Sequence, residues 1–198
     1  MVDHYFSQSP KIESRPQVVN VDICGVRLDL KTDRGVFSKN ALDFGTRTLL
    51  EAFQLSSEIE GGILDVGCGY GPIGITLSQL YPECQVTMID VNERAVELAK
   101  ENVERNRVKA DVFQSNLFEE VKGLFSAILS NPPIRAGKAV VHEILEKSYD
   151  YLNEGGELWV VIQKKQGAPS SLAKLKEVYS NVDIVRKEKG YYVICAKR

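Results

Sequence analysis

Short apolar runs alternate with amphipathic segments over residues 62–114, and this alternation restricts the fold more than any other feature of the sequence. Three runs are typical of buried strands and two have helical spacing, in the order GILDV, GPIGITLSQL, CQVTMID, NERAVELAKENVER and ADVFQ. In the second helical segment Ala95, Leu98 and Ala99 share one face, and Asn92 is placed to cap its start. Strands that alternate with helices form βαβ units, so we predict a parallel sheet with helices on its faces.

The C-terminal half continues this pattern and then changes. Residues 125–130 and 157–163 are predicted strands, and the helix between them is expected to end at Gly155-Gly156 and to bury Val141, Ile144, Leu145, Ser148 and Leu152. A further helix is expected near residues 169–180. The runs VDIVRK and YYVICAK then flank Glu188-Lys189-Gly190, and a link this short can join only antiparallel strands.

The first 58 residues precede the alternating region and are expected to pack onto it. Residues 1–16 have few apolar side chains and are predicted to be a flexible lead-in, whereas QVVNVDICGVRLDL alternates around Cys24-Gly25 like a β-hairpin. A helix is expected after a cap at Ser38 or Asn40, with its apolar face formed by Leu42, Thr46, Leu49, Leu50 and Phe53. At 198 residues the chain is expected to form a single domain, 1–198, with an extension at 17–58 and a core at 59–198.

Composition excludes several classes of function. The formal net charge of -2 disfavours a nucleic-acid binder that depends on overall positive charge, although local basic loops are compatible with one. No apolar stretch is long enough to cross a membrane and the first residues lack a signal-peptide pattern, so we expect a cytoplasmic protein without a membrane partner. The four cysteines are scattered and there are only two histidines, so no metal site is predicted.

A glycine-rich turn follows the first strand of the alternating region. Residues 65–71 read DVGCGYG, and glycines at the junction of a strand and a helix let the backbone turn tightly and approach a ligand. One strand later, Asp90 is placed to accept hydrogen bonds from the hydroxyls of a ribose. These features predict a cofactor that contains adenosine. Residues 69–74 also match the G-x-G-x-x-G pattern, so NAD stays open here, although the chain lacks a clear proton donor for hydride transfer.

The sequence Asn131-Pro132-Pro133 directly follows the predicted strand at 125–130. Because proline has a fixed φ and no N–H group, this loop is stiff and presents hydrogen-bond acceptors. The Asn131 side-chain oxygen and the Pro132 carbonyl can hold the two N–H groups of a planar amine, which directs the nitrogen lone pair at an electrophile. Ligands of doubly wound sheets bind at the carboxyl ends of the strands, so this loop and the glycine-rich turn are expected to face one crevice.

The combination of DVGCGYG, Asp90 and N-P-P resembles class I S-adenosylmethionine-dependent methyltransferases, whose N-P-P branch methylates planar amino nitrogens. Within that class the chain resembles the ribosomal RNA guanine-N2 methyltransferases of the small-domain type, through the runs GVFS at 35–38, LDFGTR at 42–47, NPPIRAGK at 131–138 and QKKQGA at 163–168. The resemblance implies a Rossmann-like, doubly wound α/β fold whose mixed sheet of seven strands has the order 3-2-1-4-5-7-6, with strand seven antiparallel. It also implies S-adenosyl-L-methionine as cofactor and RNA as partner, in the form of ribosomal RNA or a ribosomal subunit.

Site residues carry over from the family by position. Asn131 and Pro132 would be catalytic, and the cofactor would contact Asp65, Gly67, Cys68, Gly69, Asp90, Val91, Asn116 and Leu117. The family more often has Asp at the position of Asn116, but an Asn oxygen can still accept a hydrogen bond from the adenine amino group.

The implied substrate-binding residues are Phe37, Pro133, Ile134, Arg135, Lys138, Lys164 and Lys165. Ile134 departs from many N-P-P enzymes, which have an aromatic ring there, so Phe37 is either a stacking residue or part of the core. The basic loops, with Arg34, Lys39 and Arg47, are placed to bind phosphates. The predicted function is methyl transfer to an exocyclic amino nitrogen, guanine N2 of ribosomal RNA. Adenine N6, a protein glutamine amide, and a non-catalytic RNA-binding protein remain as alternatives.

Overall fold

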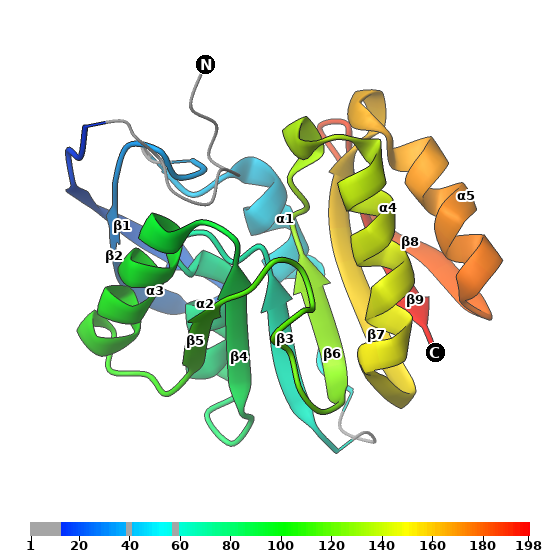
Figure 1. Ribbon diagram of the computed structural model, residues 1–198, viewed down its shortest axis with the longest axis horizontal. Helices are drawn as coiled ribbons and strands as arrows, with labels where there is room; N and C mark the ends of the chain where they lie inside the picture. The colour runs from blue at the N-terminus through cyan, green and yellow to red at the C-terminus, as the bar shows by residue number, and fades with distance from the viewer. Residues whose placement is uncertain (1–12, 39–40, 57–59) are drawn as a thin grey trace.

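The computed structural model describes residues 13–38, 41–56 and 60–198. In these residues one sheet has seven strands in the order β5-β4-β3-β6-β7-β9-β8, and a second sheet consists of β1 and β2 (Figure 1). Counted from β3, the larger sheet has the order 3-2-1-4-5-7-6, which confirms the predicted topology. No helix in the described part of the chain is long and apolar enough to cross a membrane.

The elements have the following bounds. The strands are β1 (Gln17–Ile23), β2 (Val26–Thr32), β3 (Gly62–Val66), β4 (Val86–Asp90), β5 (Asp111–Gln114), β6 (Phe125–Ser130), β7 (Leu152–Gln163), β8 (Asn181–Glu188) and β9 (Tyr191–Lys197). The α-helices are α1 (Phe44–Ala52), α2 (Pro72–Leu80), α3 (Glu93–Arg105), α4 (Lys138–Lys147) and α5 (Ala168–Val178). Short 3-10 helices are η1 (Ile134–Ala136), η2 (Ser148–Tyr151) and η3 (Lys164–Gln166).

The larger sheet separates two apolar layers. Buried side chains of α1, α2 and α3 pack on one face, and those of α4 and α5 pack on the other. The pairs β3–β4, β3–β6, β4–β5 and β6–β7 are parallel, so the loops that follow these strands emerge at one edge. β9 runs antiparallel to both β7 and β8, which confirms the arrangement expected from the short link at 188–190.

The N-terminal hairpin is joined to the core by the side chains of α3. The turn of the hairpin has Cys24 at φ 51° and Gly25 at φ 80°, the left-handed pair that a two-residue link requires. The side-chain amide of Asn102 accepts from Lys31 N at 2.7 Å and donates to Lys31 O at 2.8 Å, in the manner of a neighbouring strand. Asn106, one helical turn later, makes the same two contacts with Asp29 at 3.0 Å each. The extension therefore packs on the core as expected.

Most of the predicted lead-in lies outside the described residues. Within the described part, the Ser14 hydroxyl and the Arg15 N–H both donate to the Asp33 carboxylate, at 2.7 and 2.5 Å. The chain is therefore attached to the hairpin a few residues before β1 begins at Gln17.

Two predicted element ends are wrong. The cap of α1 is Asp43, whose side chain accepts from Thr46 N, and not Ser38; Asn40 lies outside the described residues. The helix expected to reach Gly155-Gly156 ends at Lys147 and η2, and both glycines lie inside β7. The pairing of β7 with β6 shifts in register at this point, as it does at a β-bulge. A Cβ at position 156 would lie 3.1 Å from Phe125 O, so the close approach of the two strands favours glycine there.

Candidate active site

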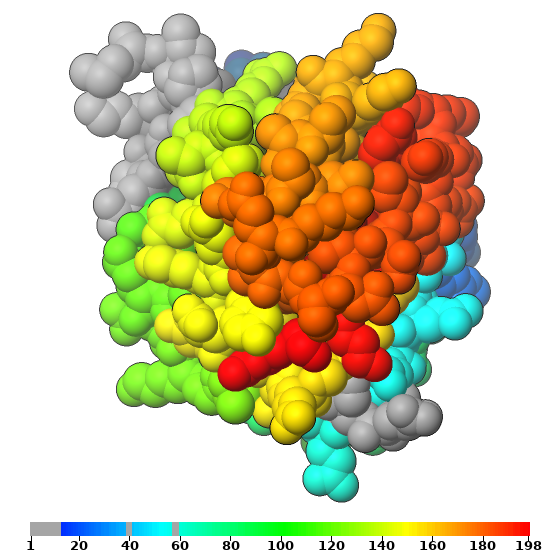
Figure 2. Space-filling model, turned by 90° about the vertical axis from the view of Figure 1, so that its right-hand side faces the viewer, coloured from blue at the N-terminus to red at the C-terminus, as the bar shows by residue number. Residues whose placement is uncertain are grey.

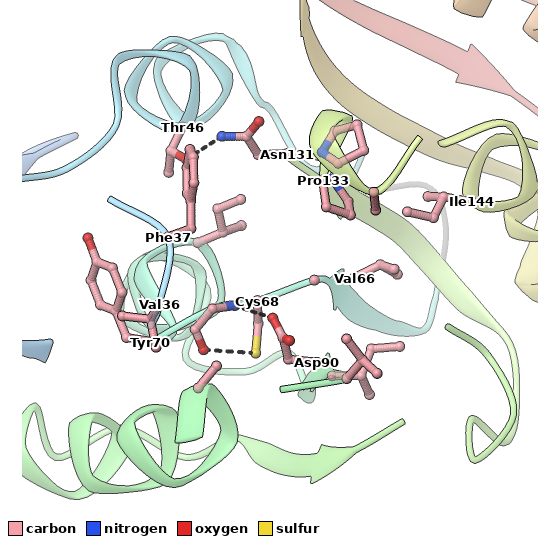
Figure 3. Close-up of a pocket in the computed structure, with 18 of the residues that line it drawn as sticks. Val36, Phe37, Thr46, Val66, Cys68, Tyr70, Asp90, Asn131, Pro133 and Ile144 are labelled. Carbon is pink, nitrogen blue, oxygen red and sulfur yellow. Dashed lines mark hydrogen bonds between the residues drawn. The ribbon is translucent and has the colours of Figure 1, made fainter. Parts of the chain in front are cut away.

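A pocket of about 270 Å³ lies at the carboxyl ends of β3, β4 and β6 (Figure 3). Its walls come from the glycine-rich turn, the loops after β4, β5 and β6, the start of α4, and the extension at residues 36–38 and 43–46. The sequence-predicted residues that line it are Phe37, Gly67, Cys68, Gly69, Asp90, Val91, Asn116, Leu117, Asn131, Pro132 and Pro133. The glycine-rich turn and the N-P-P loop therefore face one crevice.

The glycine-rich turn has space on its pocket side. Gly67 and Gly69 have φ values of 74° and 57°, in the left-handed region that favours glycine, and a Cβ at either position would meet no atom within 4 Å. The N–H groups of Gly67 and Cys68 both donate to Ile89 O at 2.9 Å, which ties the turn to β4. Gly71 is the N-cap of α2, and Pro72 and Ile73 line the pocket, so the positive end of that helix lies at the pocket.

Asp90 is held by the backbone on both of its oxygens. Oδ2 accepts from Gly69 N and Oδ1 from Asn92 N, each at 2.8 Å, while burial raises the pKa of the carboxyl. A carboxylate oxygen has more than one lone pair, so each can still accept from a ligand hydroxyl.

Asp65 lies beneath the glycine-rich turn and does not line the pocket. It is fully buried, and Oδ2 accepts from Gly74 N at 3.0 Å. Its other oxygen has no hydrogen-bond partner among the described residues, and burial raises the pKa of the carboxyl to about 7. Asp65 therefore supports the turn from below, with one acceptor unused.

The loop after β5 presents an oriented amide. Asn116 Nδ2 donates to Glu119 Oε1 at 2.7 Å, which leaves the Asn116 oxygen as the available acceptor. The Ser115 hydroxyl donates to Leu117 O at 2.7 Å and fixes this turn, in which Leu117 has φ 51°. The apolar residues of the pocket wall and the Asn116 oxygen together suit an amino-substituted aromatic ring.

Asn131 is anchored through its amide nitrogen. Nδ2 donates to Asp43 Oδ2 at 2.9 Å and to Thr46 Oγ1 at 3.0 Å, whereas Oδ1 has no hydrogen-bond partner among the described residues. Since a carboxylate only accepts, the contact with Asp43 identifies which end of the amide is nitrogen. The Ser130 hydroxyl donates to Val66 O at 2.8 Å and joins the end of β6 to the end of β3.

The extension contributes pocket residues that the sequence did not predict as site residues, among them Val36, Ser38, Asp43, Thr46 and, facing them from the core, Tyr70. The Tyr70 hydroxyl donates to Ser38 O at 3.4 Å, and Asn92 Nδ2 donates to Gly35 O at 3.0 Å. Phe37 is 37% exposed and lies at the pocket wall rather than in the core (Figure 3). The family-like runs at 35–38 and 42–47 indicated in the sequence that this segment belongs to the site. They did not indicate a role for Asp43 or Thr46.

The remaining predicted substrate residues lie outside the pocket lining. Ile134 is half-buried and packs on the layer of α4 and α5. Arg135, Lys138, Lys164 and Lys165 are exposed on the loops after β6 and β7. These loops lie side by side with the β8–β9 turn at one end of the molecule, where Lys164 N donates to Gly190 O at 2.7 Å (Figure 2).

The other side chains predicted to bind phosphates are less well placed to contact RNA at the pocket. The Arg47 guanidinium donates to Asp22 O at 3.1 Å and lies 3.9 Å from the Glu51 carboxylate, so it is directed to the hairpin. Lys39 lies outside the described residues. Arg34 O accepts from the Arg94 guanidinium at 2.8 Å, which anchors the backbone of the extension to α3.

The hydrogen-bond acceptors of the pocket fit S-adenosyl-L-methionine. Asp90 offers acceptors for a ribose diol, the Asn116 oxygen offers one for an adenine amino group, and the open side of the glycine-rich turn leaves room for the rest of the molecule. Together with the 3-2-1-4-5-7-6 sheet, this site defines a Rossmann-like S-adenosylmethionine-dependent methyltransferase.

The comparison with known sequences identifies the family. The chain belongs to the Methyltransferase small domain family, which residues 27–195 match. It is 51% identical over 201 residues to Uncharacterized protein YbxB of Bacillus subtilis, with 100% of both chains covered. It is 38% identical over 138 residues to Ribosomal RNA small subunit methyltransferase C of Shigella flexneri, covering 68% of this chain and 40% of that protein.

Solved structures agree on the fold. The T. thermophilus 16S rRNA N2 G1207 methyltransferase RsmC, in complex with AdoMet and guanosine, superposes with a TM-score of 0.83 at 24% identity. That match covers 96% of this chain and 52% of the other. The chain therefore spans about half the length of RsmC and 40% of Ribosomal RNA small subunit methyltransferase C of Shigella flexneri.

Proposed function

We propose that this methyltransferase acts on an exocyclic amino nitrogen, guanine N2 of ribosomal RNA. One observation carries the proposal: Asn131 lines the pocket, and its amide nitrogen is held by Asp43 and Thr46, so its oxygen remains available as an acceptor. An amine that is to be methylated is a hydrogen-bond donor, so an acceptor is the group that holds it. The names of the methyltransferase C relatives and of RsmC support ribosomal RNA and guanine as the substrate.

The cofactor residues are part of this proposal. Asp90 binds the ribose hydroxyls, beside Val91, and Asn116 and Leu117 contact the adenine. The backbone of Gly67, Cys68 and Gly69 borders the methionine part of the cofactor. Asp65 supports the glycine-rich turn from beneath and does not touch the cofactor itself. Each of these residues except Asp65 lines the pocket, which is what this assignment requires.

Orientation is the main catalytic contribution of the protein. S-adenosyl-L-methionine, when bound, supplies a methyl group made electrophilic by the sulfonium. Asn131 Oδ1 and the Pro132 carbonyl accept hydrogen bonds from the two N–H groups of the substrate amine. These contacts direct the nitrogen lone pair at the electrophilic methyl group. The described residues that line the pocket include no histidine or lysine. None is needed, because attack makes the nitrogen acidic and the Pro132 carbonyl or water then accepts its proton.

The target base must reach this pocket from single-stranded RNA or be flipped out of a duplex. Phe37 provides a ring at the pocket wall on which the base can stack, and Pro133 provides a further apolar contact. Arg135, Lys138, Lys164 and Lys165 bind phosphates outside the pocket, while Ile134 supports the loop from the core side.

Methyl transfer from isotope-labelled S-adenosylmethionine tests the proposal. The purified protein is incubated with ribosomal RNA, with small ribosomal subunits and with ribosomal protein, and the products are digested and identified by mass. We expect labelled N2-methylguanosine, formed about a hundredfold more slowly by Asn131→Ala. Labelled N6-methyladenosine or methylglutamine would overturn the choice of guanine. Tight RNA binding without transfer to any substrate would indicate a non-catalytic RNA-binding protein.

A further inference from the structure

The start of α1 contacts the N-P-P loop through the Asp43 carboxylate and the Thr46 hydroxyl. Asp43 is the N-cap of α1, and its Oδ2 accepts from Thr46 N at 3.0 Å. The same oxygen accepts from Asn131 Nδ2 at 2.9 Å. Thr46 Oγ1 accepts from that nitrogen at 3.0 Å (Figure 3). Helix cap and catalytic amide are thus joined across 88 residues of sequence.

The orientation of the Asn131 amide determines whether it can hold an amine. An asparagine side chain can turn its oxygen and nitrogen through 180°, and in the turned state it would present N–H donors to a substrate that is itself a donor. Asp43 prevents this state, because a carboxylate beside the amide oxygen would place two acceptors against each other. The Thr46 hydroxyl can act as donor or acceptor, so it adds a contact but selects no orientation by itself.

We propose that Asp43, assisted by Thr46, is a positioning residue that fixes the Asn131 amide with its oxygen toward the target amine, so that the N-terminal extension is part of the active site. The proposal rests on the role given to Asn131 in the proposed function, and it assigns a function to the LDFGTR run.

The position of Asp43 is itself determined by packing. Leu49 and Leu50 of α1 are buried in the core, which fixes the helix against the sheet. Gly45 leaves the room that the carboxylate occupies: a Cβ at Gly45 would lie 2.9 Å from Asp43 Oδ2 and 2.9 Å from the Tyr191 ring. Any larger side chain at Gly45 would therefore displace either the carboxylate or the ring.

Variants can separate this role from helix capping. In Asp43→Ser the shorter side chain still caps the helix but does not reach Asn131. Thr46→Val removes the second contact. Thr48→Val is its matched control, since Thr48 is also buried on α1 and, among the described residues, its hydroxyl bonds to Phe44 O alone. We expect kcat to fall about tenfold or more in Asp43→Ser, about threefold in Thr46→Val, and less than twofold in Thr48→Val. The cofactor Kd should stay within twofold throughout.

A double-mutant cycle tests whether Asp43 acts through Asn131. In single-turnover assays on the Asn131→Ala background, adding Asp43→Ser should change the rate less than twofold. A similar loss on both backgrounds would show that Asp43 acts independently and would overturn the proposal. Wild-type kcat in Asp43→Ser would overturn it as well.

A substrate-free measurement keeps this test separate from the identity of the substrate. In the NMR spectrum of the protein, the Asn131 side-chain NH₂ protons should exchange slowly with solvent, and about tenfold faster in Asp43→Ser but not in Thr48→Val. Unchanged exchange in Asp43→Ser would overturn the positioning role. If this arm succeeds while no guanosine is methylated, the proposed substrate fails and the positioning role stands.

Discussion

Two asparagine amides at the pocket are oriented by carboxylates, Asn131 by Asp43 and Asn116 by Glu119. A side-chain amide is both donor and acceptor, so its chemistry depends on which end faces the ligand. In both cases the amide nitrogen donates hydrogen bonds within the protein, and the amide oxygen remains available to a ligand. We therefore propose that both residues act as acceptors, Asn131 for the amino group of the substrate and Asn116 for that of adenine.

Replacing Asn131 separates catalysis from binding. Asn131→Ala removes an acceptor of the target amine while leaving Asp90 and the glycine-rich turn in place. We expect single-turnover methyl transfer to fall by about a hundredfold or more, the scale seen when one transition-state hydrogen-bonding group is removed. Calorimetry should show an unchanged cofactor Kd, and filter binding an RNA affinity within about threefold of wild type. A wild-type transfer rate would mean that the N-P-P loop is only a turn.

Asp90 should govern cofactor affinity. Asp90→Ala removes the proposed acceptors of the ribose hydroxyls and also releases the N–H groups of Gly69 and Asn92. We expect the free energy of S-adenosylmethionine binding to weaken by about 1 to 3 kcal/mol, measured by calorimetry. Asp183→Ala, on the exposed strand β8, serves as control and should change nothing. Equal affinities for all three proteins would place the ribose elsewhere.

Asp65 should make stability depend on pH. Burial raises its pKa from 3.8 to about 7, so the folded protein keeps a proton that the unfolded chain has released. This contribution to the free energy of unfolding is full below the unfolded pKa and is lost as the pH rises through the folded one. Between pH 5 and 8 wild type should lose about 2 to 3 kcal/mol that Asp65→Asn does not lose, as measured by urea unfolding. Parallel pH profiles would contradict a buried proton.

The residues of the site were predictable where the chemistry is local in sequence. The glycine-rich turn, Asp90 and Asn131 each sit at a strand end, and sequence spacing alone places strand ends of a parallel sheet at one edge. Asp43 and Thr46 were missed because their partner is 85 or more residues away. Their sequence signature, a carboxylate three residues before a threonine, indicates only a helix cap.

At the scale of elements, the hairpin is held to α3 by two asparagines one helical turn apart. Asn102 is fully buried and bonds to Lys31 and to Tyr70 O, the latter at 2.9 Å, whereas Asn106 is half-buried and bonds to Asp29. Asn102→Ala leaves Lys31 N, Lys31 O and the buried Tyr70 O without these partners, so we expect a loss of about 2 to 4 kcal/mol in the free energy of unfolding, against about 1 kcal/mol for Asn106→Ala. Urea unfolding measures both. Equal losses would mean that burial of the contact is unimportant.

The elements themselves were largely predicted, because apolar periodicity reflects which face is buried. Asn92 caps α3 as expected, with its side chain accepting from Ala95 N at 3.2 Å. The end of α4 was misplaced because a pair of glycines is compatible with both a helix end and a strand bulge. Only the pairing of β7 with β6 decides between them, and that pairing is a property of the sheet.

At the scale of the whole molecule, the pocket forms between parts of the chain that are far apart in sequence. The extension closes one side and the loops after β3, β4, β5 and β6 close the others. Exposed basic residues follow β6 and β7 at this edge, although the chain as a whole has a net charge of -2. A local basic region next to the pocket can bind RNA without overall positive charge, because phosphate contacts act over short distances in physiological salt.

The position of these charges should determine the salt dependence of RNA binding. Lys164 and Lys165 lie in η3 at the pocket edge of the sheet, while Lys109 and Lys122 are exposed just before β5 and β6, at the opposite edge. Removing either pair changes the net charge equally. If η3 contacts phosphates, Lys164→Ala with Lys165→Ala should weaken RNA binding about tenfold near 0.1 M salt. The slope of log K against log salt concentration, which is negative, should become shallower by about 1 to 2. Lys109→Ala with Lys122→Ala should leave both nearly unchanged. Filter binding between 50 and 300 mM salt measures the two slopes, and equal effects of the two pairs would mean that RNA responds only to net charge.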